Sequence, residues 1–89
     1  MQLRASHILV ETEQQAQQLL EQIRAGADFA EVARQTSRCP SGRSGGDLGQ
    51  FPLGAMVPEF ERAVIDNAVG SLVGPVRTQF GYHVIHRTA

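Results

Sequence analysis

The stretch Ala5-Ser6-His7-Ile8-Leu9-Val10, together with residues 12–26 that follow it, decides the fold of this chain. Residues 5–10 form a short run of apolar and β-branched side chains, which is typical of a strand buried on at least one face. Thr12 and Gln15 have the spacing of a helix capping box, and apolar residues then recur at helical spacing up to a glycine at the end of the run. The sequence therefore predicts a strand at 5–10 and a helix at about 13–25.

Further elements follow from the way Gly and Pro interrupt the chain. Asp28 and Glu31 repeat the capping signal for a second helix that ends near residue 36, and Pro58 is well placed to begin a third. The remaining pieces are a loop at 37–47, a brief strand at 48–51, and a closing hairpin of two short strands at 76–78 and 82–86. This order predicts an α+β fold with a small, largely antiparallel sheet.

The composition describes one domain without a strong field of charge. The 89 residues are 42% hydrophobic and 19% charged, which suits a single compact domain over residues 1–89. Eight positive and nine negative side chains give a net charge of −1, so we expect neither nucleic acid nor anionic lipid as a partner. All eight positive residues are Arg, and the absence of Lys excludes Schiff-base chemistry and a P-loop.

The same features set the expected compartment. Cys39 is the one cysteine, so no disulfide can form within the chain, and the N-terminal residues lack the apolar core of a secretory signal. No apolar run approaches the roughly 18 residues that are needed to span a bilayer. We therefore expect a cytoplasmic protein that does not contact a membrane and that acts as a monomer.

Cys39 and the three histidines raise the hypothesis of a zinc site. The sequence contains neither a Cys-x-x-Cys nor a His-x-x-x-His pair, and strand alternation places His83 and His86 on opposite faces. The glycines at 42–49 match neither nucleotide-binding pattern, and they precede a strand rather than a helix. We therefore expect no metal and no cofactor.

A lone thiol and an apolar cluster are the candidates that remain. A single Cys with distant His residues is the minimum for a cysteine hydrolase, whereas most lone cysteines are inert core residues. The Gly- and Ser-rich loop around Cys39 favours a site over a packing role, although not hydrolysis. Leu48, Phe51, Met56 and Phe60 bracket a Pro-bounded turn beside that loop. We assign Phe51 to the core, while Met56 fits either the core or an adaptable apolar pocket.

Four motifs occur in unbroken order along the chain. They are His7-Ile8-Leu9-Val10, Cys39-Pro40-Ser41-Gly42 with Gly45-Gly46-Asp47-Leu48-Gly49-Gln50-Phe51, Gly54-Ala55-Met56-Val57-Pro58-Glu59-Phe60-Glu61, and Gly74-Pro75-Val76 with Thr78-Gln79-Phe80-Gly81-Tyr82-His83-Val84-Ile85. Over residues 5–88 the chain resembles the parvulins, which are peptidyl-prolyl cis-trans isomerases, and among them the small single-domain bacterial members. The resemblance implies a four-stranded antiparallel sheet flanked by about four helices, a parvulin-like form of the FKBP-like superfold.

The resemblance also implies which residues form the site. His7 and His83 are similar to the paired histidines of the parvulin sheet, and strand alternation allows both to project from one face. Two further residues, Cys39 and Thr78, are expected to complete a hydrogen-bonded catalytic wall with them. The substrate is expected to contact an apolar set made of Leu48, Met56, Phe60 and Phe80.

These residues imply a prolyl isomerase that assists protein folding without a cofactor. Rotation about an Xaa-Pro bond breaks no covalent bond, so an apolar slot for the ring and a polar wall for the carbonyl can favour the twisted state. The expected partners are proline-containing peptides and unfolded protein clients. The alternative is a non-catalytic chaperone or binding module that holds proline-containing segments without turning them over.

The segment after the first strand bears on specificity. Some parvulins select phosphorylated Ser or Thr before the proline through basic residues in that connection, where this chain has Glu11-Thr12-Glu13. Two carboxylates repel a phosphate, and Phe80 stands where those relatives carry a serine. We therefore predict no phospho-specificity and a preference for apolar or uncharged residues before the proline, with Arg43 as the one feature that points the other way.

Overall fold

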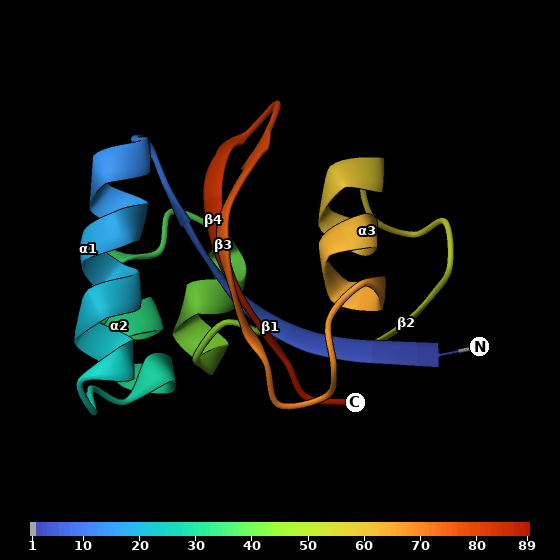
Figure 1. The fold of residues 1–89 in the computed structure, drawn as a ribbon, viewed down its shortest axis with the longest axis horizontal. Coiled ribbons are helices and arrows are strands. Elements are labelled where there is room, and N and C mark those ends of the chain that lie inside the picture. Colours follow the sequence, from blue (N-terminus) through green and yellow to red (C-terminus); the bar gives the residue numbers. More distant parts are fainter. Residues whose placement is uncertain (1) are drawn as a thin grey trace.

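The computed structural model describes residues 2–89, which form one sheet with helices on both of its faces (Figure 1). The strands are β1 (Gln2–Val10), β2 (Asp47–Pro52), β3 (Leu72–Thr78) and β4 (Gly81–Arg87). The helices are α1 (Glu13–Arg24), α2 (Phe29–Thr36) and α3 (Pro58–Ile65), and a 3-10 helix, η1, spans Pro40–Ser44. The predicted α+β class is confirmed, with three α-helices and η1 as the helical segments among the described residues.

All neighbouring strands of the sheet are antiparallel, in the order β2-β1-β4-β3. β1 begins at Gln2 rather than at residue 5, because its first residues pair with the end of β2 and bury Leu3. β3 begins at Leu72 rather than at residue 76. Its pairing with β4 shifts between Val73 and Val76, so the Gly-Pro pair that predicted a break lies inside the strand as an irregularity.

Helices cover the two faces of the sheet unequally. α1 and α2 lie on one face and α3 lies on the other (Figure 1). The core under α1 and α2 consists of buried apolar side chains, namely Ile8, Val10, Ala16, Leu19, Leu20, Val32, Ala33 and Val84. The core under α3 contains Leu3, Ala5, Phe51, Phe60, Val64 and Ile85. The prediction that Phe51 belongs to the core is confirmed, since its side chain is 3% exposed.

The helices begin where the capping signals predict. The backbone N–H of Gln15 donates to Thr12 Oγ1 over 3.1 Å, and Gln15 Oε1 accepts from the Thr12 N–H over 3.2 Å, which completes the capping box of α1. At α2, Asp28 accepts from the N–H of Glu31 over 3.1 Å. α3 begins with a proline, which requires no N–H partner at that position.

The segment between α2 and β2 lies along the edge of β1 that β2 leaves unpaired. The N–H of Arg38 donates to the Leu9 carbonyl over 2.8 Å, and the N–H of His7 donates to the Gly46 carbonyl over 2.9 Å. Gly46 has φ of +84°, and a Cβ there would lie 2.4 Å from the His7 carbonyl oxygen, so only glycine fits. This close pairing places η1 and Cys39 beside the middle of β1.

Candidate active site: a histidine pair beside an apolar pocket

Two histidines and a threonine form a buried hydrogen-bonded chain on the α3 face of the sheet. His7 on β1 and His83 on β4 approach with their Nδ1 atoms 3.0 Å apart and their ring planes 18° apart. His83 Nε2 lies 2.7 Å from Thr78 Oγ1, at the end of β3. The exposed fractions of the three residues are 5%, 4% and 7%, so these hydrogen bonds have little competition from water.

The partners of Thr78 are consistent with one arrangement of the protons in this chain. Thr78 Oγ1 accepts from the backbone N–H of Phe80 over 3.2 Å, which leaves its hydroxyl hydrogen free to be donated to His83 Nε2. His83 then carries its proton on Nδ1 and donates it to His7 Nδ1. In this arrangement the proton of His7 is on Nε2, a buried atom that has no partner within residues 2–89.

Burial keeps both imidazoles neutral. Loss of hydration, with a smaller contribution from the neighbouring His83, lowers the pKa of His7 to about 4. Burial also lowers the pKa of His83. A neutral pair can accept and donate hydrogen bonds, but it lacks the positive charge that holds a cysteine as its thiolate.

Cys39 stands apart from the histidine pair. Its Sγ accepts a hydrogen bond from the Ser41 hydroxyl over 3.3 Å, and no hydrogen bond joins it to a histidine in the part of the chain that the structure describes. The arrangement therefore differs from that of a cysteine hydrolase, in which an imidazole contacts the sulfur.

An apolar pocket of about 520 Å³ opens beside the pair. Six of the residues predicted for the site line it, namely His7, Cys39, Leu48, Met56, Phe60 and Phe80. Five other residues that line it were not predicted, namely Leu9, Arg38, Pro40, Ala55 and Val57. Strand alternation already placed Leu9 on the side of His7, whereas nothing in the sequence pattern marked the rest. Of the two readings of Met56, its half-buried side chain satisfies both, since it lines the pocket and packs on the α3 core.

Thr78 and His83 do not line this pocket, although both were predicted for its polar wall. They connect to it through His7 and Phe80, to which they are hydrogen-bonded. Phe60 forms the boundary between pocket and core, with its ring 5.5 Å from each imidazole at nearly perpendicular angles. The pocket wall is thus held by buried residues behind it.

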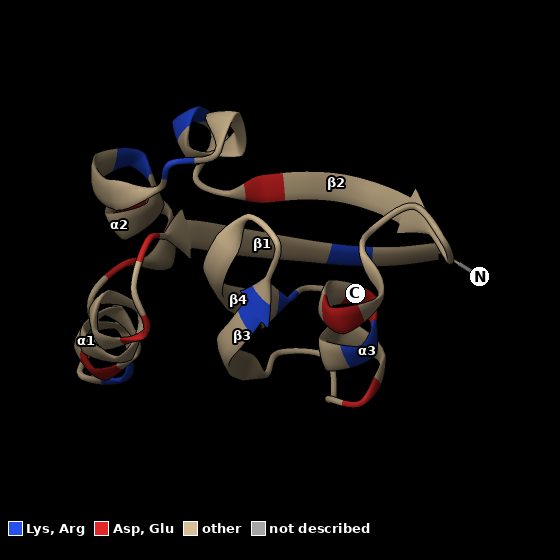
Figure 2. Ribbon diagram, turned by 90° about the horizontal axis from the view of Figure 1, so that it is seen from above, with Lys and Arg blue, Asp and Glu red and all other residues tan. Residues whose placement is uncertain are grey.

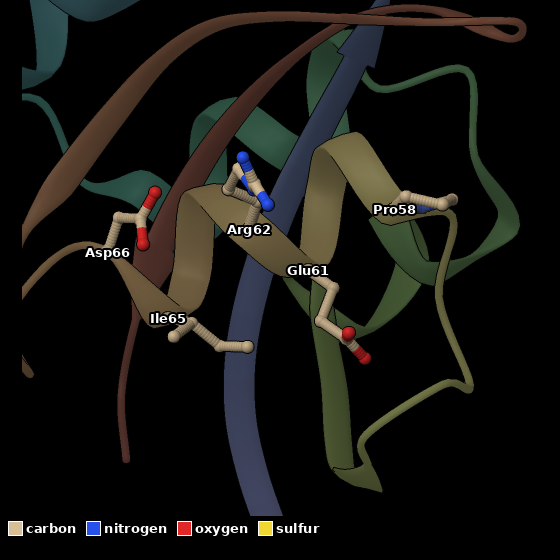
Figure 3. A pocket seen from close by; sticks show the side chains of 5 residues that line it. All are labelled: Pro58, Glu61, Arg62, Ile65 and Asp66. Carbon is tan, nitrogen blue, oxygen red and sulfur yellow. The ribbon is translucent and has the colours of Figure 1, made fainter.

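A second hollow, of about 480 Å³, lies on the outer side of α3 (Figure 3). Its lining residues come from that helix and from Asp66, which caps its end, and Figure 3 shows charged groups among them, such as Glu61, Arg62 and Asp66. It contains no histidine or cysteine and no second wall, so it offers less to a ligand than the pocket beside His7.

Residues 2–89 contain neither a cluster of metal-binding side chains nor a helix that could span a membrane. No three His, Cys, Asp or Glu side chains of this range are grouped so that they could hold a metal ion. None of its helices combines the length and the apolar character that crossing a bilayer requires.

Comparison with known proteins places the chain in a family. Residues 6–89 match the family model of the rotamase, or PPIC-type PPIase, domain. Among curated proteins, the chain is similar to the foldase protein PrsA of Caldanaerobacter subterraneus, with 45% identity over 84 residues. The match covers 93% of this chain but 28% of that protein, so the chain spans less than a third of the length of this relative.

Solved structures agree in sequence and in fold. A crystal structure of the peptidylprolyl isomerase PrsA from Bacillus anthracis superposes with a TM-score of 0.96 at 43% identity, over 98% of this chain and 41% of that one. NmPin, the parvulin of Nitrosopumilus maritimus, superposes with a TM-score of 0.88 at 35% identity, over 99% of this chain and 96% of its own. The chain therefore belongs to the PPIC-type peptidyl-prolyl isomerase family, the parvulins.

Proposed function

We propose that this chain catalyses cis-trans isomerisation of Xaa-Pro bonds in peptides and unfolded proteins. The observation that carries the proposal is the apolar pocket of about 520 Å³ with a neutral, hydrogen-bonded histidine in its wall. Membership of the PPIC-type family supports the same activity, and similar proteins are named foldases. A monomeric state and a cytoplasmic location stay predictions from the sequence.

The physical task matches the groups that the pocket provides. The barrier to rotation is about 18 to 20 kcal/mol, because the amide loses its resonance when it is twisted. Leu48, Met56 and Phe60 offer the apolar surface for the proline ring. A dry pocket also removes the water that stabilises the planar, charge-separated amide. Lowering the barrier by about 7 kcal/mol accelerates exchange roughly 10⁵-fold.

We assign the polar part of the task to His7. Its Nε2 atom has no partner within residues 2–89, and a buried polar atom without a partner costs about 1 to 3 kcal/mol. Because Nε2 is buried, a carbonyl oxygen of the bound prolyl segment would reach it only if binding moves the side chains that cover it. His83 and Thr78 are positioning residues in this scheme, since they fix the tautomer of His7 and hold the backbone of Phe80.

Exchange spectroscopy on an Ala-Leu-Pro-Phe peptide tests the activity directly. An isomerase makes the cis and trans resonances of the peptide exchange with each other, at enzyme concentrations far below that of the peptide. A binding module would shift these resonances in proportion to its concentration without exchanging them, which would contradict the proposal. Met56→Ala, which removes part of the ring-binding surface, should weaken the exchange.

The non-covalent mechanism has its own test at Cys39. Cys39→Ser and Cys39→Asp remove the thiol, and a mechanism that needs no acyl-enzyme should keep activity above about a tenth of the wild-type value. Loss of activity in both variants, with unchanged thermal stability, would return covalent catalysis to consideration. Thermal unfolding of each variant supplies that control.

A further inference from the structure

A third cavity adjoins the apolar pocket and is lined by arginines. It has a volume of about 540 Å³, and Arg34, Arg38 and Arg43 all line it. Arg38, Cys39 and Pro40 line both cavities, so the two meet at these residues. In Figure 2, the blue segments of α2, of the connection after it and of η1 gather at one end of the molecule.

Local packing brings the three arginines together. Arg34 lies in the last turn of α2, and the backbone of Arg38 is bonded to β1. Arg43 lies in η1, which packs tightly on α2, since a Cβ on Gly42 would lie 2.9 Å from the Ala33 carbonyl oxygen. The three arginines lie within residues 34–43 of the sequence, and the packing of η1 on α2 brings them to one cavity.

The ion pairs of this region leave one positive charge uncompensated. Arg34 pairs with Glu31 over 3.2 Å, and Arg38 pairs with Glu11. Arg43 has no carboxylate partner within residues 2–89. Three arginines and two glutamates sum to one positive charge, which suits a group of single negative charge better than a dianionic phosphate.

We propose that this cavity is a subsite for an acidic side chain of the client, an Asp or Glu near the proline. An extended segment seated in the apolar pocket must cross Cys39 and Pro40 before it reaches Arg43. Because Arg34 and Arg43 line this cavity and not the apolar pocket, we expect the acidic residue about two to four residues from the proline rather than directly before it. The inference rests on the proposed function and names a substrate class for the same site.

A peptide scan tests the subsite. Glu and Gln are compared at each of these positions on both sides of the proline, and the kcat/KM of the Glu peptide is divided by that of the Gln peptide. We expect the ratio to reach about three to five at one position, because exposed ion pairs contribute modestly. High salt should reduce the ratio towards one. A ratio near one at every position would overturn the inference.

Matched variants assign the effect to the cavity. Arg43→Gln should bring the ratio close to one, while Arg24→Gln, which makes the same charge change in the last turn of α1, should leave it unchanged. Equal ratios in the two variants would show a general charge effect and contradict the subsite. Thermal unfolding of both variants checks that they are folded.

Two further results separate the alternatives. A phosphoserine peptide that turns over faster than the glutamate peptide would assign the cavity to phosphate and overturn the carboxylate proposal. If none of the peptides were isomerised, the neutral ones included, this result would contradict the isomerase function itself. Turnover of the Gln peptides with a ratio of one would contradict the subsite alone.

Discussion

The two faces of the sheet share the same four strands but differ in what covers them. Under α1 and α2 the buried side chains are apolar, and Leu20 and Val84 are almost completely removed from water. Under α3, a helix of eight residues, the same strands present His7 and His83. α3 leaves the apolar pocket open beside these histidines.

The comparison separates the source of stability from the source of function. Two helices seal one face, so its side chains contribute mainly by removal of apolar surface from water. One helix leaves the other face incomplete, and the buried polar groups there are kept by hydrogen bonds to each other. The same substitution should therefore have different consequences on the two faces.

Leu20→Ala should have the largest effect of the substitutions considered, and that effect should be on stability. Its side chain is 1% exposed, and a buried Leu→Ala change costs about 3 to 5 kcal/mol through lost transfer free energy and a residual cavity. Chemical denaturation measures the loss, and turnover per folded molecule should stay unchanged. Leu53→Ala, at a position 49% exposed, is the matched control and should cost less than about 0.5 kcal/mol.

Acidic pH should lower the free energy of unfolding, because His7 and His83 are buried on the α3 face. Because the pKa of His7 is about 4 when folded, against 6.5 normally, the unfolded chain binds more protons between these values. This contribution to the free energy of unfolding is fully present above pH 6.5. It should fall by about 2 to 3 kcal/mol as the pH drops to 4, and His83 changes in the same direction.

Denaturation at several pH values measures this slope. His7→Gln removes one titrating group and should flatten the slope between pH 6.5 and pH 4. Leu20→Ala should lower the stability at every pH and keep the wild-type slope. An unchanged slope in His7→Gln would show that the acid sensitivity arises elsewhere.

Leu48→Ala makes the same change as Leu20→Ala, but on the face of the sheet that α3 covers. Leu48 is half-buried and lines the pocket, so it should contribute to holding the proline ring. We expect kcat/KM to fall about tenfold, which corresponds to about 1.4 kcal/mol of transition-state stabilisation. The stability loss should stay below about 1 kcal/mol. If the loss in the free energy of unfolding exceeded the loss in transition-state stabilisation, the proposed difference between the two faces would be wrong.

Phe80→Ala should give the smallest effect. The ring is 63% exposed and lines the pocket from the turn before β4. Its loss should reduce kcat/KM about threefold, mostly through KM, because the ring adds apolar contact at the pocket mouth. The free energy of unfolding should be unchanged. If the substitution lowered kcat and left KM unchanged, Phe80 would instead contact the substrate in the transition state only.

The extent to which the sequence predicts this molecule depends on which forces act locally. Helix starts at Thr12 and Asp28 depend on bonds three residues apart, so they were predicted correctly. η1 was missed and its residues were predicted as a loop, because its Gly- and Ser-rich segment lacks apolar periodicity and is held by packing on α2 and pairing with β1.

The site follows the same division. The resemblance to a family, read with strand alternation, placed His7 and His83 on one face. The observed register pairs His7 with Ile85 and His83 with Leu9, so the two histidines are diagonal neighbours on adjacent strands. Arg38 was not predicted as a pocket residue, because the sequence does not distinguish a charged side chain that lines an apolar pocket from one that is exposed. Thr78 lies behind the pocket wall because it is hydrogen-bonded to His83 on the neighbouring strand. No local sequence pattern predicts such a bond between strands.

The hydroxyl of Thr78 makes the molecule convenient to observe. It joins the main-chain nitrogen of Phe80 to the ring of His83, and through that ring to His7. Protonation or a tautomer change in either imidazole must alter the polarity felt at that amide. The nitrogen-15 chemical shift of the Phe80 amide, in an exposed turn, should therefore report protonation or a tautomer change of the buried imidazoles.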